Sequence, residues 1–371
     1  MKTVIMAGGR GTRMQALFPE FPKPMIPIGG RPVLEWQICS LREQGLTDLI
    51  LTVSYRADQI MNAFGDGRRW GVHIDYVVER EPLGTAGALF GLLPRLGTEP
   101  FLLMNADSIF EVDFGRFADF HRKQGYPVTL LAHGNDHPGD SSLLITSPEG
   151  IVREWLTPEE KRPEWARNCV NAGLHILDPA ILSRQAGTFV GAVDLDRQVL
   201  KPLCATGEMI CYPSWEYARD MGTPERYGRV CRDFSSGVME ARHVRNRQRA
   251  VFIDRDLLIR FRSPDAFALL PGAGEAVRRI NAGGCLVFAV ETEMDTFPEE
   301  EIRRRLDTLL VREGAALDGY IPAGTGVEAF LNAEGQRIDP EKSFTVGKVN
   351  ARIGAHCSGL TELVRQMRFP D

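Results

Sequence analysis

The residues best suited to chemistry lie near the start of the chain, where a short apolar run ends in a glycine-rich loop. The run of residues 4–7 stops at Gly8 and Gly9, Arg13 follows in the same loop, and Lys23 comes ten residues later. Glycine lets backbone N–H groups turn toward an anion, while arginine and lysine supply positive charge for phosphate oxygens. A lone GGxG would fit an ordinary strand-to-helix turn. GGRGTR followed by PKP instead favours a loop that holds a nucleoside triphosphate.

Two aspartates are the best candidates for metal ligands. Asp107 ends the apolar run PFLLMNAD, and Asp220 stands in ARDMGTPERY, so both carboxylates lie beside apolar residues, where an unpaired charge is costly. Mg²⁺ is typically bound by one or two carboxylates together with substrate phosphates, and this favours a metal role for Asp107. Asp220 fits equally well as the N-cap of a helix that starts near Thr223 and Pro224.

Two further segments have the composition of ligand-binding turns. Residues 81–87 (EPLGTAG) form a second glycine-bearing turn, whose small side chains would let a flat base lie against the backbone. The same residues also fit a simple helix start after Pro82. On a predicted strand further along, the side-chain amide of Asn171 either binds hydroxyls of a sugar or closes a turn toward Gly173. The residues alone leave both pairs of interpretations open.

Composition excludes several classes of protein. The chain has 371 residues and a formal net charge of −5, which gives no support to nucleic-acid binding. No apolar run approaches the length of about 18–20 residues that a membrane span needs. The seven cysteines contain no CxxC pair, so we expect reduced thiols in a cytoplasmic protein that has no membrane partner. The oligomeric state stays open, a homo-oligomer included.

The elements that must position these residues follow from the alternation of apolar runs with helical patterns. Short runs that are apolar on both faces alternate with helices through the first half, which predicts a doubly wound, mostly parallel sheet. Ligands in such sheets lie at the carboxyl ends of the strands, where the Gly8 loop and Asp107 both fall. Hairpin-like strands follow from about residue 127, and a second α/β unit starts at residue 250. Helices are expected at residues 32–45, 57–65 and 85–95.

Taken together, the motifs AGGRGTRM, PKPM, EPLGTAGAL, NAD, VNAG and DMGTPE resemble those of the sugar-1-phosphate nucleotidyltransferases. The resemblance covers residues 1–230 and is greatest to the mannose-1-phosphate and D-glycero-α-D-manno-heptose-1-phosphate guanylyltransferases. It implies a Rossmann-like, GT-A-like mixed sheet. It also implies transfer of a nucleoside monophosphate from an NTP, with GTP favoured, to a sugar 1-phosphate, releasing pyrophosphate. From the sequence alone, guanine, cytosine and uracil all remain open as the base.

The resemblance also assigns roles to individual residues. It implies catalysis by Arg13, Lys23 and Asp107, with Mg²⁺ held by Asp107 and Asp220 and the sugar bound by Asn171. Where the family carries a lysine for the sugar phosphate, the chain reads LTPEEKRPEWARN. Lys161 is the nearest candidate there, and Arg162 or Arg167 could replace it. The implied nucleotide-binding residues are Gly8, Gly9, Gly11, Thr12, Glu81, Gly84 and Thr85.

The mechanism that follows is mainly electrostatic. The second pKa of a phosphate monoester is near 6, so the sugar phosphate is already an anion that can attack the α-phosphorus without a general base. The protein must therefore bring two polyanions together. Mg²⁺, Arg13 and Lys23 would offset their repulsion and stabilise the pyrophosphate that leaves.

The second unit, expected at residues 250–371 after a linker at 231–249, resembles the haloacid dehalogenase superfamily and within it the heptose bisphosphate phosphatases. Asp254 and Asp256 stand where that family has its nucleophile and its acid/base. Other expected residues are replaced, by Glu291 at the second strand end and by GKVNAR at residues 347–352. We therefore expect a degenerate, HAD-like α/β domain without activity, and the DRD sequence also fits a plain surface turn. Two alternatives remain, namely a regulatory protein that binds sugar nucleotides without turnover, and a bifunctional enzyme with an active sugar phosphatase.

Overall fold

The chain folds into two units in this computed structural model, which describes residues 1–79, 81, 83–261, 266–292, 297–349, 351 and 353–367. The first unit comprises Met1–Ala132, Thr146–Trp155 and Asn171–Gly237. The second comprises His133–Ile145, Leu156–Val170 and Val238–Asp371. Two short segments from the first half of the chain therefore belong to the second unit, as does the whole chain from Val238 on.

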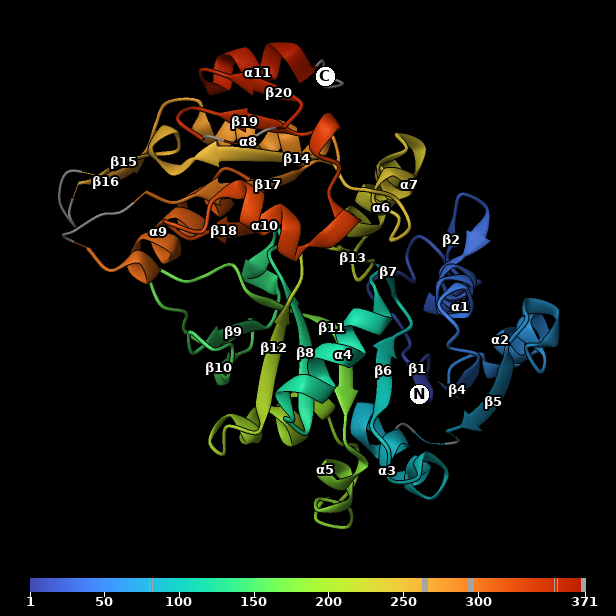
Figure 1. The fold of residues 1–371 in the computed structure, drawn as a ribbon. Coiled ribbons are helices and arrows are strands. Elements are labelled where there is room, and N and C mark those ends of the chain that lie inside the picture. The colour runs from blue at the N-terminus through green and yellow to red at the C-terminus, as the bar shows by residue number, and fades with distance from the viewer. Residues whose placement is uncertain are drawn as a thin grey trace. The chain divides into compact units, whose positions relative to one another are not determined.

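The first unit is built on a mixed, mostly parallel sheet, as predicted. Strand β1 is parallel to both β4 and β6, β4 is parallel to β5, and β11 is antiparallel to β6 (Figure 1). Strand β12 is parallel to β8, which also pairs with β11. The strands are β1 (Thr3–Met6), β4 (Asp48–Val53), β5 (His73–Val78), β6 (Phe101–Asn105), β8 (Val128–His133), β11 (Val170–Leu177) and β12 (Met209–Pro213).

The ends of helices in the first unit are set by capping residues, as α4 shows. Helix α4 starts at Asp113, whose carboxylate accepts a hydrogen bond from Arg116 N, and it ends at Gly125, which has a φ of 70°. The helices predicted at residues 32–45, 57–65 and 85–95 are confirmed as α1, α2 and α3. The helices are α1 (Val33–Glu43), α2 (Ala57–Phe64), α3 (Gly84–Leu96), α4 (Phe114–Gln124), α5 (Pro179–Ser183) and α6 (Pro224–Ser235).

Smaller elements complete the first unit and the segments next to it. Two-stranded ladders join β2 to β3 and β7 to β13, and both are antiparallel. In the second unit, Val170 of β11 is paired with Leu143 of β9. The bounds are β2 (Pro27–Ile28), β3 (Arg31–Pro32), β7 (Ser108–Glu111), β9 (Leu143–Thr146), β10 (Val152–Leu156) and β13 (Tyr217–Asp220).

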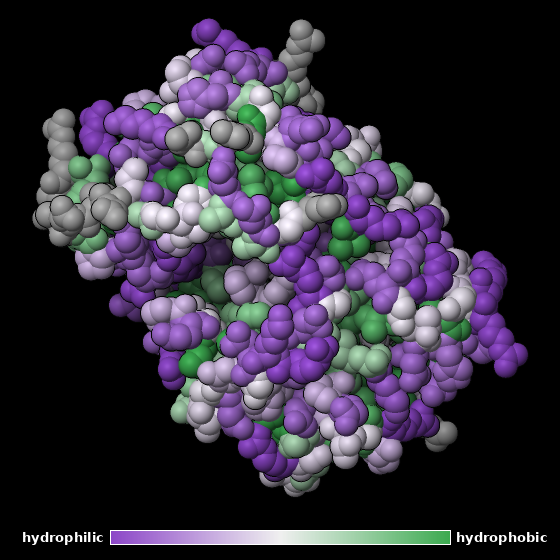
Figure 2. All heavy atoms as spheres, viewed as in Figure 1, coloured by the Kyte–Doolittle hydropathy of each residue, from purple (hydrophilic) through white to green (hydrophobic). Residues whose placement is uncertain are grey.

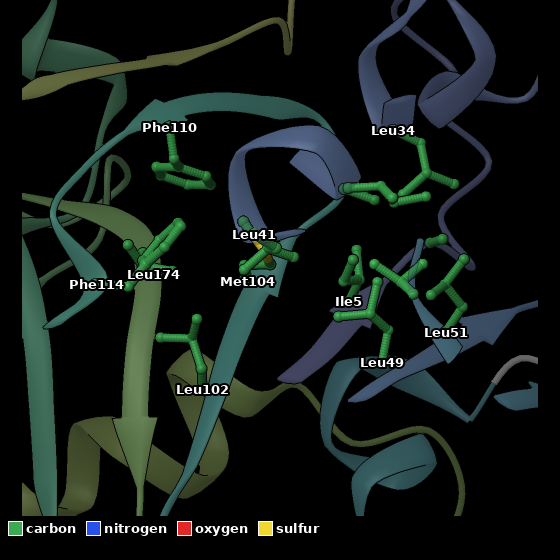
Figure 3. Packing of buried hydrophobic residues seen from close by; sticks show 14 of the residues in the cluster. Ile5, Leu34, Leu41, Leu49, Leu51, Leu102, Met104, Phe110, Phe114 and Leu174 are labelled. Carbon is green, nitrogen blue, oxygen red and sulfur yellow. The ribbon is translucent and has the colours of Figure 1, made fainter. Parts of the chain in front are cut away.

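The core of the first unit packs side chains of α1 against one face of the sheet. Figure 3 shows Leu41 of α1 beside Met104 of β6, and Leu34 of α1 beside Ile5 and Leu51 of the neighbouring strands. These side chains are fully buried. Burial of an apolar side chain of this size contributes about 1.5–3 kcal/mol. The packing therefore holds the strands, and with them the loops at their ends, in fixed positions.

The second unit has a smaller sheet in which every pair of neighbouring strands is parallel, in the order β18-β17-β14-β19-β20. The first strand in the sequence lies in the middle, which is the arrangement of a doubly wound α/β fold. The predicted second α/β unit is thereby confirmed. Its elements are β14 (Ala250–Asp254), β17 (Leu286–Val290), β18 (Gly319–Ile321), β19 (Phe344–Val346), β20 (Ala355–Cys357), α7 (Val238–Ala241), α8 (Ala273–Ala282), α9 (Glu299–Arg312), α10 (Val327–Ala333), α11 (Leu360–Met367) and a hairpin of β15 (Ile259–Phe261) with β16 (Phe267–Leu269).

Hydrophilic side chains predominate on the face shown in Figure 2. Across the described residues, no helix is both long enough and apolar enough to span a membrane. The large apolar side chains that are exposed come from separate segments of the chain, for example Leu17, Val190 and Phe234. Isolated apolar side chains of this kind are normal on a protein surface and need no partner.

Candidate active site

A cavity of about 750 Å³ lies in the first unit at the carboxyl ends of β1, β4, β5 and β6. Its size is that of a small-molecule site, typically about 300–1,000 Å³. Its position is where ligands bind in open α/β sheets. The sequence-predicted residues that line it are Gly8, Gly9, Gly11, Thr12, Arg13, Lys23, Gly84, Thr85 and Asp107.

The glycine-rich loop lies close to the predicted lysine. Gly11 has a φ of 62°, and a Cβ placed on it would lie 3.0 Å from the Cβ of Lys23. Lys23 begins a 3₁₀ turn at Lys23–Met25, and its Nζ is paired with Oδ2 of Asp107. The structure therefore pairs Lys23 with Asp107 and places Arg13, the third residue predicted to be catalytic, in the lining of the same cavity. Glycine at position 11 allows the loop to approach Lys23 closely.

The two predicted metal ligands lie side by side at the end of one ladder. Asp220 of β13 is opposite Ser108 of β7, and Met221 N donates to the backbone oxygen of Asp107 at 2.9 Å. The helix-cap role that the sequence offered for Asp220 belongs to Thr223, whose hydroxyl accepts from Arg226 N at 3.3 Å. Asp220 instead accepts from Nη1 of Arg226 at 2.7 Å.

These carboxylates fit a magnesium ion that is delivered with a nucleotide. Asp107 and Asp220 supply two carboxylates, and Mg²⁺ is typically held by one or two carboxylates together with substrate phosphates and waters. Among the described residues, no group of three or more His, Cys, Asp or Glu side chains could hold a metal without such help. Arg13 lies nearby, since its Nη2 is 3.6 Å from the position of a Cβ on Gly222.

The start of α3 is fixed by a segment from far along the chain. Gly84 has a φ of 75°, and a Cβ there would lie only 2.3 Å from the backbone oxygen of Val193. Ala86 N donates to that same oxygen at 2.9 Å, and the hydroxyl of Thr85 accepts from Leu195 N at 2.7 Å. The close approach requires glycine at position 84. It also fixes the position of Gly84 and Thr85, which line the cavity.

Glu79 is a residue that sequence reasoning missed. It lines the cavity, whereas Glu81, which was assigned to nucleotide binding, is exposed and is not among the lining residues. Burial raises the pKa of Glu79, and a weak hydrogen bond from Leu83 N opposes that rise. A Cβ on Gly8 would lie 3.4 Å from its Oε1. Glu79 follows directly after the apolar run of β5, so the strand-end rule that identified Asp107 could also have found it.

Asn171 lies in a polar cluster with Gly173 and His175 of the same strand, β11, and with Asp196 from further along the chain. The Oδ1 of Asn171 accepts a hydrogen bond from Gly173 N at 3.2 Å and lies 3.0 Å from Nε2 of His175. Its Nδ2 donates to Oδ2 of Asp196 at 3.4 Å. Burial raises the pKa of Asp196 to about 7 and lowers the pKa of His175 to about 4. A Cβ on Gly173 would lie 2.3 Å from Nδ2 of Asn105, which lines the cavity. Asn171 therefore closes the predicted turn.

The three candidates for the sugar-phosphate contact all lie in the second unit. Lys161 is exposed. Arg162 donates to the backbone oxygens of Pro138, at 2.6 Å, and Ser141. Arg167 is paired with Asp307, with Nε 2.8 Å from Oδ2. Both arginines are thus engaged in contacts within the second unit.

The aspartates of the second unit are engaged by neighbouring groups. Asp254 is buried at the end of β14 and accepts from Asp256 N at 3.1 Å and from Lys348 N at 3.2 Å. Asp256 accepts from the hydroxyl of Thr292 at 3.2 Å. Glu291 forms a bidentate ion pair with Arg303, at 2.7 and 2.6 Å. Two positions of the GKVNAR segment, 350 and 352, lie outside the described residues.

This fold, with a glycine-rich loop and an acidic pair at the strand ends, is that of a nucleotide-transferring α/β enzyme. The nucleotidyl transferase family model matches residues 2–234, and the chain belongs to this family. The mannose-1-phosphate guanyltransferase of Aspergillus oryzae is 32% identical over 241 residues, which cover 64% of this chain and 63% of that protein. The mannose-1-phosphate guanylyltransferase of Mycobacterium tuberculosis is 32% identical over 238 residues, 63% of this chain and 65% of that one. The chain thus spans less than two thirds of the length of these relatives.

Solved structures show the same fold. HddC from Yersinia pseudotuberculosis, complexed with GMP-PN, is 27% identical with a TM-score of 0.55 and covers 63% of this chain and 99% of that chain. A putative glucose-1-phosphate thymidylyltransferase from Bacillus anthracis is 20% identical with a TM-score of 0.57, covers 62% of this chain and 94% of that one, and supports the fold alone.

Proposed function

We propose that the protein is a sugar-1-phosphate guanylyltransferase, which transfers GMP from GTP to a sugar 1-phosphate of the mannose or heptose type and releases pyrophosphate. The observation that carries the proposal is the pair of Lys23 with Asp107 beside the glycine-rich loop of one cavity, with Asp220 at the end of the adjoining β7–β13 ladder. The names of the relatives at 32% identity support it.

The residues of the cavity would act by positioning and by charge. The backbone N–H groups of the glycine-rich loop and the side chain of Arg13 would hold the triphosphate, and Lys23 would neutralise charge on the reacting phosphates. Asp107 and Asp220 would hold Mg²⁺, which supplies charge neutralisation between the two anions. By the resemblance, Asn171 would contact the sugar. The attacking oxygen is already ionised at neutral pH, so the site needs no general base.

The carboxylate of Glu79 favours guanine over the other bases. A carboxylate accepts two hydrogen bonds side by side, and guanine presents two adjacent donors, N1–H and the N2 amino group, on one edge. Adenine, cytosine and uracil do not present such a pair. Glu79 lies at the end of the cavity near Gly8 and Leu83, and we therefore assign base recognition to it in place of the exposed Glu81.

The test is a panel of four nucleoside triphosphates against mannose, glucose and heptose 1-phosphates, with pyrophosphate release as the readout. We expect release with GTP and a mannose- or heptose-type substrate. Glu79→Gln should lower kcat/KM for GTP about tenfold or more, since a charged hydrogen bond is worth about 1.5–3 kcal/mol. The control Glu81→Gln should not. Equal use of CTP or UTP by the wild type would contradict the assignment of guanine. GTP binding without any pyrophosphate would instead indicate a regulatory protein.

For the second unit we propose a degenerate haloacid dehalogenase-type domain without phosphatase activity. The strand order and the position of Asp254 at the end of the central strand support the fold assignment. Two replacements support the lack of activity: Glu291, which is paired with Arg303, stands at the second strand end, and GKVNAR stands where the family has further acids. No phosphate should be released from a heptose 1,7-bisphosphate. Release that Asp254→Asn abolishes would overturn this proposal.

A further inference from the structure

Arg226 stands directly after the DMGTPE motif and takes no part in the proposed transfer. It lies in the first turn of α6, where its backbone N–H donates to the hydroxyl of Thr223 at 3.3 Å. Its side chain is only 14% exposed, and Nη1 donates to Oδ1 of Asp220 at 2.7 Å. A guanidinium is always protonated in proteins, so this is a charged hydrogen bond, the stronger kind. Arg226 therefore places a permanent positive charge beside one of the two candidate metal ligands.

Three charged groups of the first unit meet at Gly222, a residue that lines the cavity. Gly222 N donates to Oδ1 of Asp220 at 2.9 Å, so this oxygen accepts two hydrogen bonds. A Cβ on Gly222 would lie 3.3 Å from Nη1 of Arg226 and 3.6 Å from Nη2 of Arg13. Both guanidinium groups and the carboxylate are therefore close neighbours at the wall of the cavity. Arg226 thus lies at the candidate active site.

The other candidate metal ligand also has a basic partner. Nζ of Lys23 is paired with Oδ2 of Asp107. The backbone oxygen of Asp107 accepts from Met221 N, next to Asp220, at 2.9 Å. Each of the two carboxylates is thus paired with a basic side chain of the protein.

The first turn of α6 is connected to both basic partners. Tyr227, next to Arg226, donates from its hydroxyl to Pro27 O at 2.9 Å. Its ring packs edge-on against Phe18, with the ring centroids 5.1 Å apart. Lys23 lies between Phe18 and Pro27 in the sequence. Helix α6 therefore supports the segment that carries Lys23 as well as Arg226 itself.

The cluster has two carboxylates and three basic groups, so its net charge is positive. The other charged residues that line the cavity, Arg10 and Glu79, have opposite signs and leave this balance unchanged. Such a charge attracts a nucleotide and gives a bare divalent cation no net attraction. A bare cation would also have to displace Lys23 and Arg226 from the carboxylates. The phosphates of a nucleotide, by contrast, offer both basic side chains new partners.

We propose that Arg226 is the counter-ion of Asp220 and that, together with Lys23, it makes the two carboxylates accept a divalent metal ion with a nucleotide in preference to the ion alone. Arg226 is a positioning residue, since it acts through Asp220 and not on the reacting phosphates. The inference rests on the proposed function for the metal role of Asp107 and Asp220.

The test is a titration of the full-length protein with Mn²⁺ in the absence of nucleotide, with the free ion measured by electron paramagnetic resonance. Carboxylate and water ligands suit Mn²⁺ and Mg²⁺ alike. We expect Arg226→Met to bind Mn²⁺ about tenfold or more tightly than wild type does, because Asp220 loses a charged partner. Arg226→Lys keeps the charge and should bind like wild type. So should the control Arg232→Met, which removes an exposed charge from the last turn of the same helix.

Two further variants locate the effect. Asp220→Asn combined with Arg226→Met should return the affinity for Mn²⁺ to the wild-type value. If Arg226→Met fails to fold, Lys23→Met decides, since it removes the partner of Asp107 and should produce the same gain. Wild type should bind GTP with Mg²⁺, measured by calorimetry, more tightly than it binds Mn²⁺ alone.

An unchanged or weaker affinity for Mn²⁺ in folded Arg226→Met, or in Lys23→Met where that variant decides, would overturn the proposal. So would a gain that persists with Asp220→Asn, because it would arise at another site, or wild-type binding of Mn²⁺ alone that is as tight as binding of GTP with Mg²⁺. A wild type that releases no pyrophosphate with any substrate pair contradicts the proposed function. The Mn²⁺ titrations need no turnover, so the two failures are told apart.

Discussion

Asp107 is the residue whose loss the account predicts to be most damaging. Its carboxylate pairs with Lys23, and its backbone oxygen accepts from Met221 N, next to Asp220, so a metal and the reacting phosphates would meet here. Asp107→Ala should therefore lower the rate of pyrophosphate release at least about a hundredfold, the typical effect of losing one strong contact to the transition state. Asp119→Ala, which removes an exposed carboxylate of α4, is the matched control and should leave the rate unchanged. A near-normal rate for Asp107→Ala would refute the metal role.

The raised pKa of Asp196 predicts how the stability of the protein depends on pH. The pKa of its carboxyl is raised to about 7, mainly by burial and also by Asp194, while Asn171 and Arg197 oppose the rise. The ordinary value of about 3.9 applies in the unfolded chain, so the folded protein holds the extra proton between about pH 4 and 7. This residue's contribution to stability therefore falls as pH rises through that window and is constant above it. Asp196→Asn should be more stable relative to wild type at pH 8 than at pH 5, as measured by denaturant unfolding.

A constant difference between Asp196→Asn and wild type across that range would contradict the raised pKa. His175 also titrates within this window, in the opposite direction, because burial lowers its pKa to about 4. Comparison of the variant with wild type at each pH cancels the contribution of His175, which both proteins share. The difference then reports on Asp196.

Residues of the site were predictable where a local signal marks them. The glycine-rich loop and Asp107 directly follow apolar strands, whose ends meet at one edge of an α/β sheet, and Lys23 stands in a PKP motif ten residues after Arg13. Asp196 and Arg226 carry no such signal. The neighbours that give them a role come from other segments, as with Asn171, which lies 25 residues before Asp196. Burial changes the pKa of Asp196, and burial is a property of the fold.

At the scale of elements, the start of α3 depends on one glycine. A Cβ on Gly84 would overlap the backbone of Val193, and the φ of 75° is unfavourable for any other residue. Gly84→Ala should therefore lower both the melting temperature and the affinity for GTP, because α3 must shift away from the cavity. The control is Gly91→Ala in the same helix, where a Cβ meets nothing within 4 Å. That change should stabilise the protein by about 0.5–1 kcal/mol.

Equal melting temperatures for Gly84→Ala and wild type would contradict the close approach to Val193. The helices themselves were predictable from the spacing of apolar residues, and α1, α2 and α3 lie where that spacing placed them. The ladder of β7 with β13 was not. Its strands lie more than a hundred residues apart in the sequence, and each has only four residues, too few for a pattern to be distinctive.

At the scale of the whole molecule, the sequence predicts two α/β units, and both are present. No pattern in the sequence indicates that the 133–145 and 156–170 segments belong to the second unit. Arg167 and Asp307 are 140 residues apart, and neither lies in a motif. An ion pair of this kind is specified by tertiary packing, and one sequence without its relatives does not reveal it. The 133–145 and 156–170 segments are therefore assigned to the second unit by the structure alone.

Because the 156–170 segment belongs to the second unit, removal of the C-terminal part of that unit should affect this segment. A fragment of residues 1–237 loses α9, so Trp165 and Arg167 lose their partners. We expect a red-shifted tryptophan emission and a lower melting temperature than in the full chain. A fragment with the tryptophan emission and melting temperature of the full chain would contradict this dependence.

The central claim is that the cavity at the end of β1 binds a nucleoside triphosphate with Mg²⁺, and calorimetric titration of GTP into the protein tests it most directly. We expect one site per chain. We also expect tighter binding with Mg²⁺ than with a chelator, and weaker binding to Lys23→Ala by about tenfold or more, because a charged contact is lost. Absence of GTP binding to the wild type in the presence of Mg²⁺ would contradict this claim.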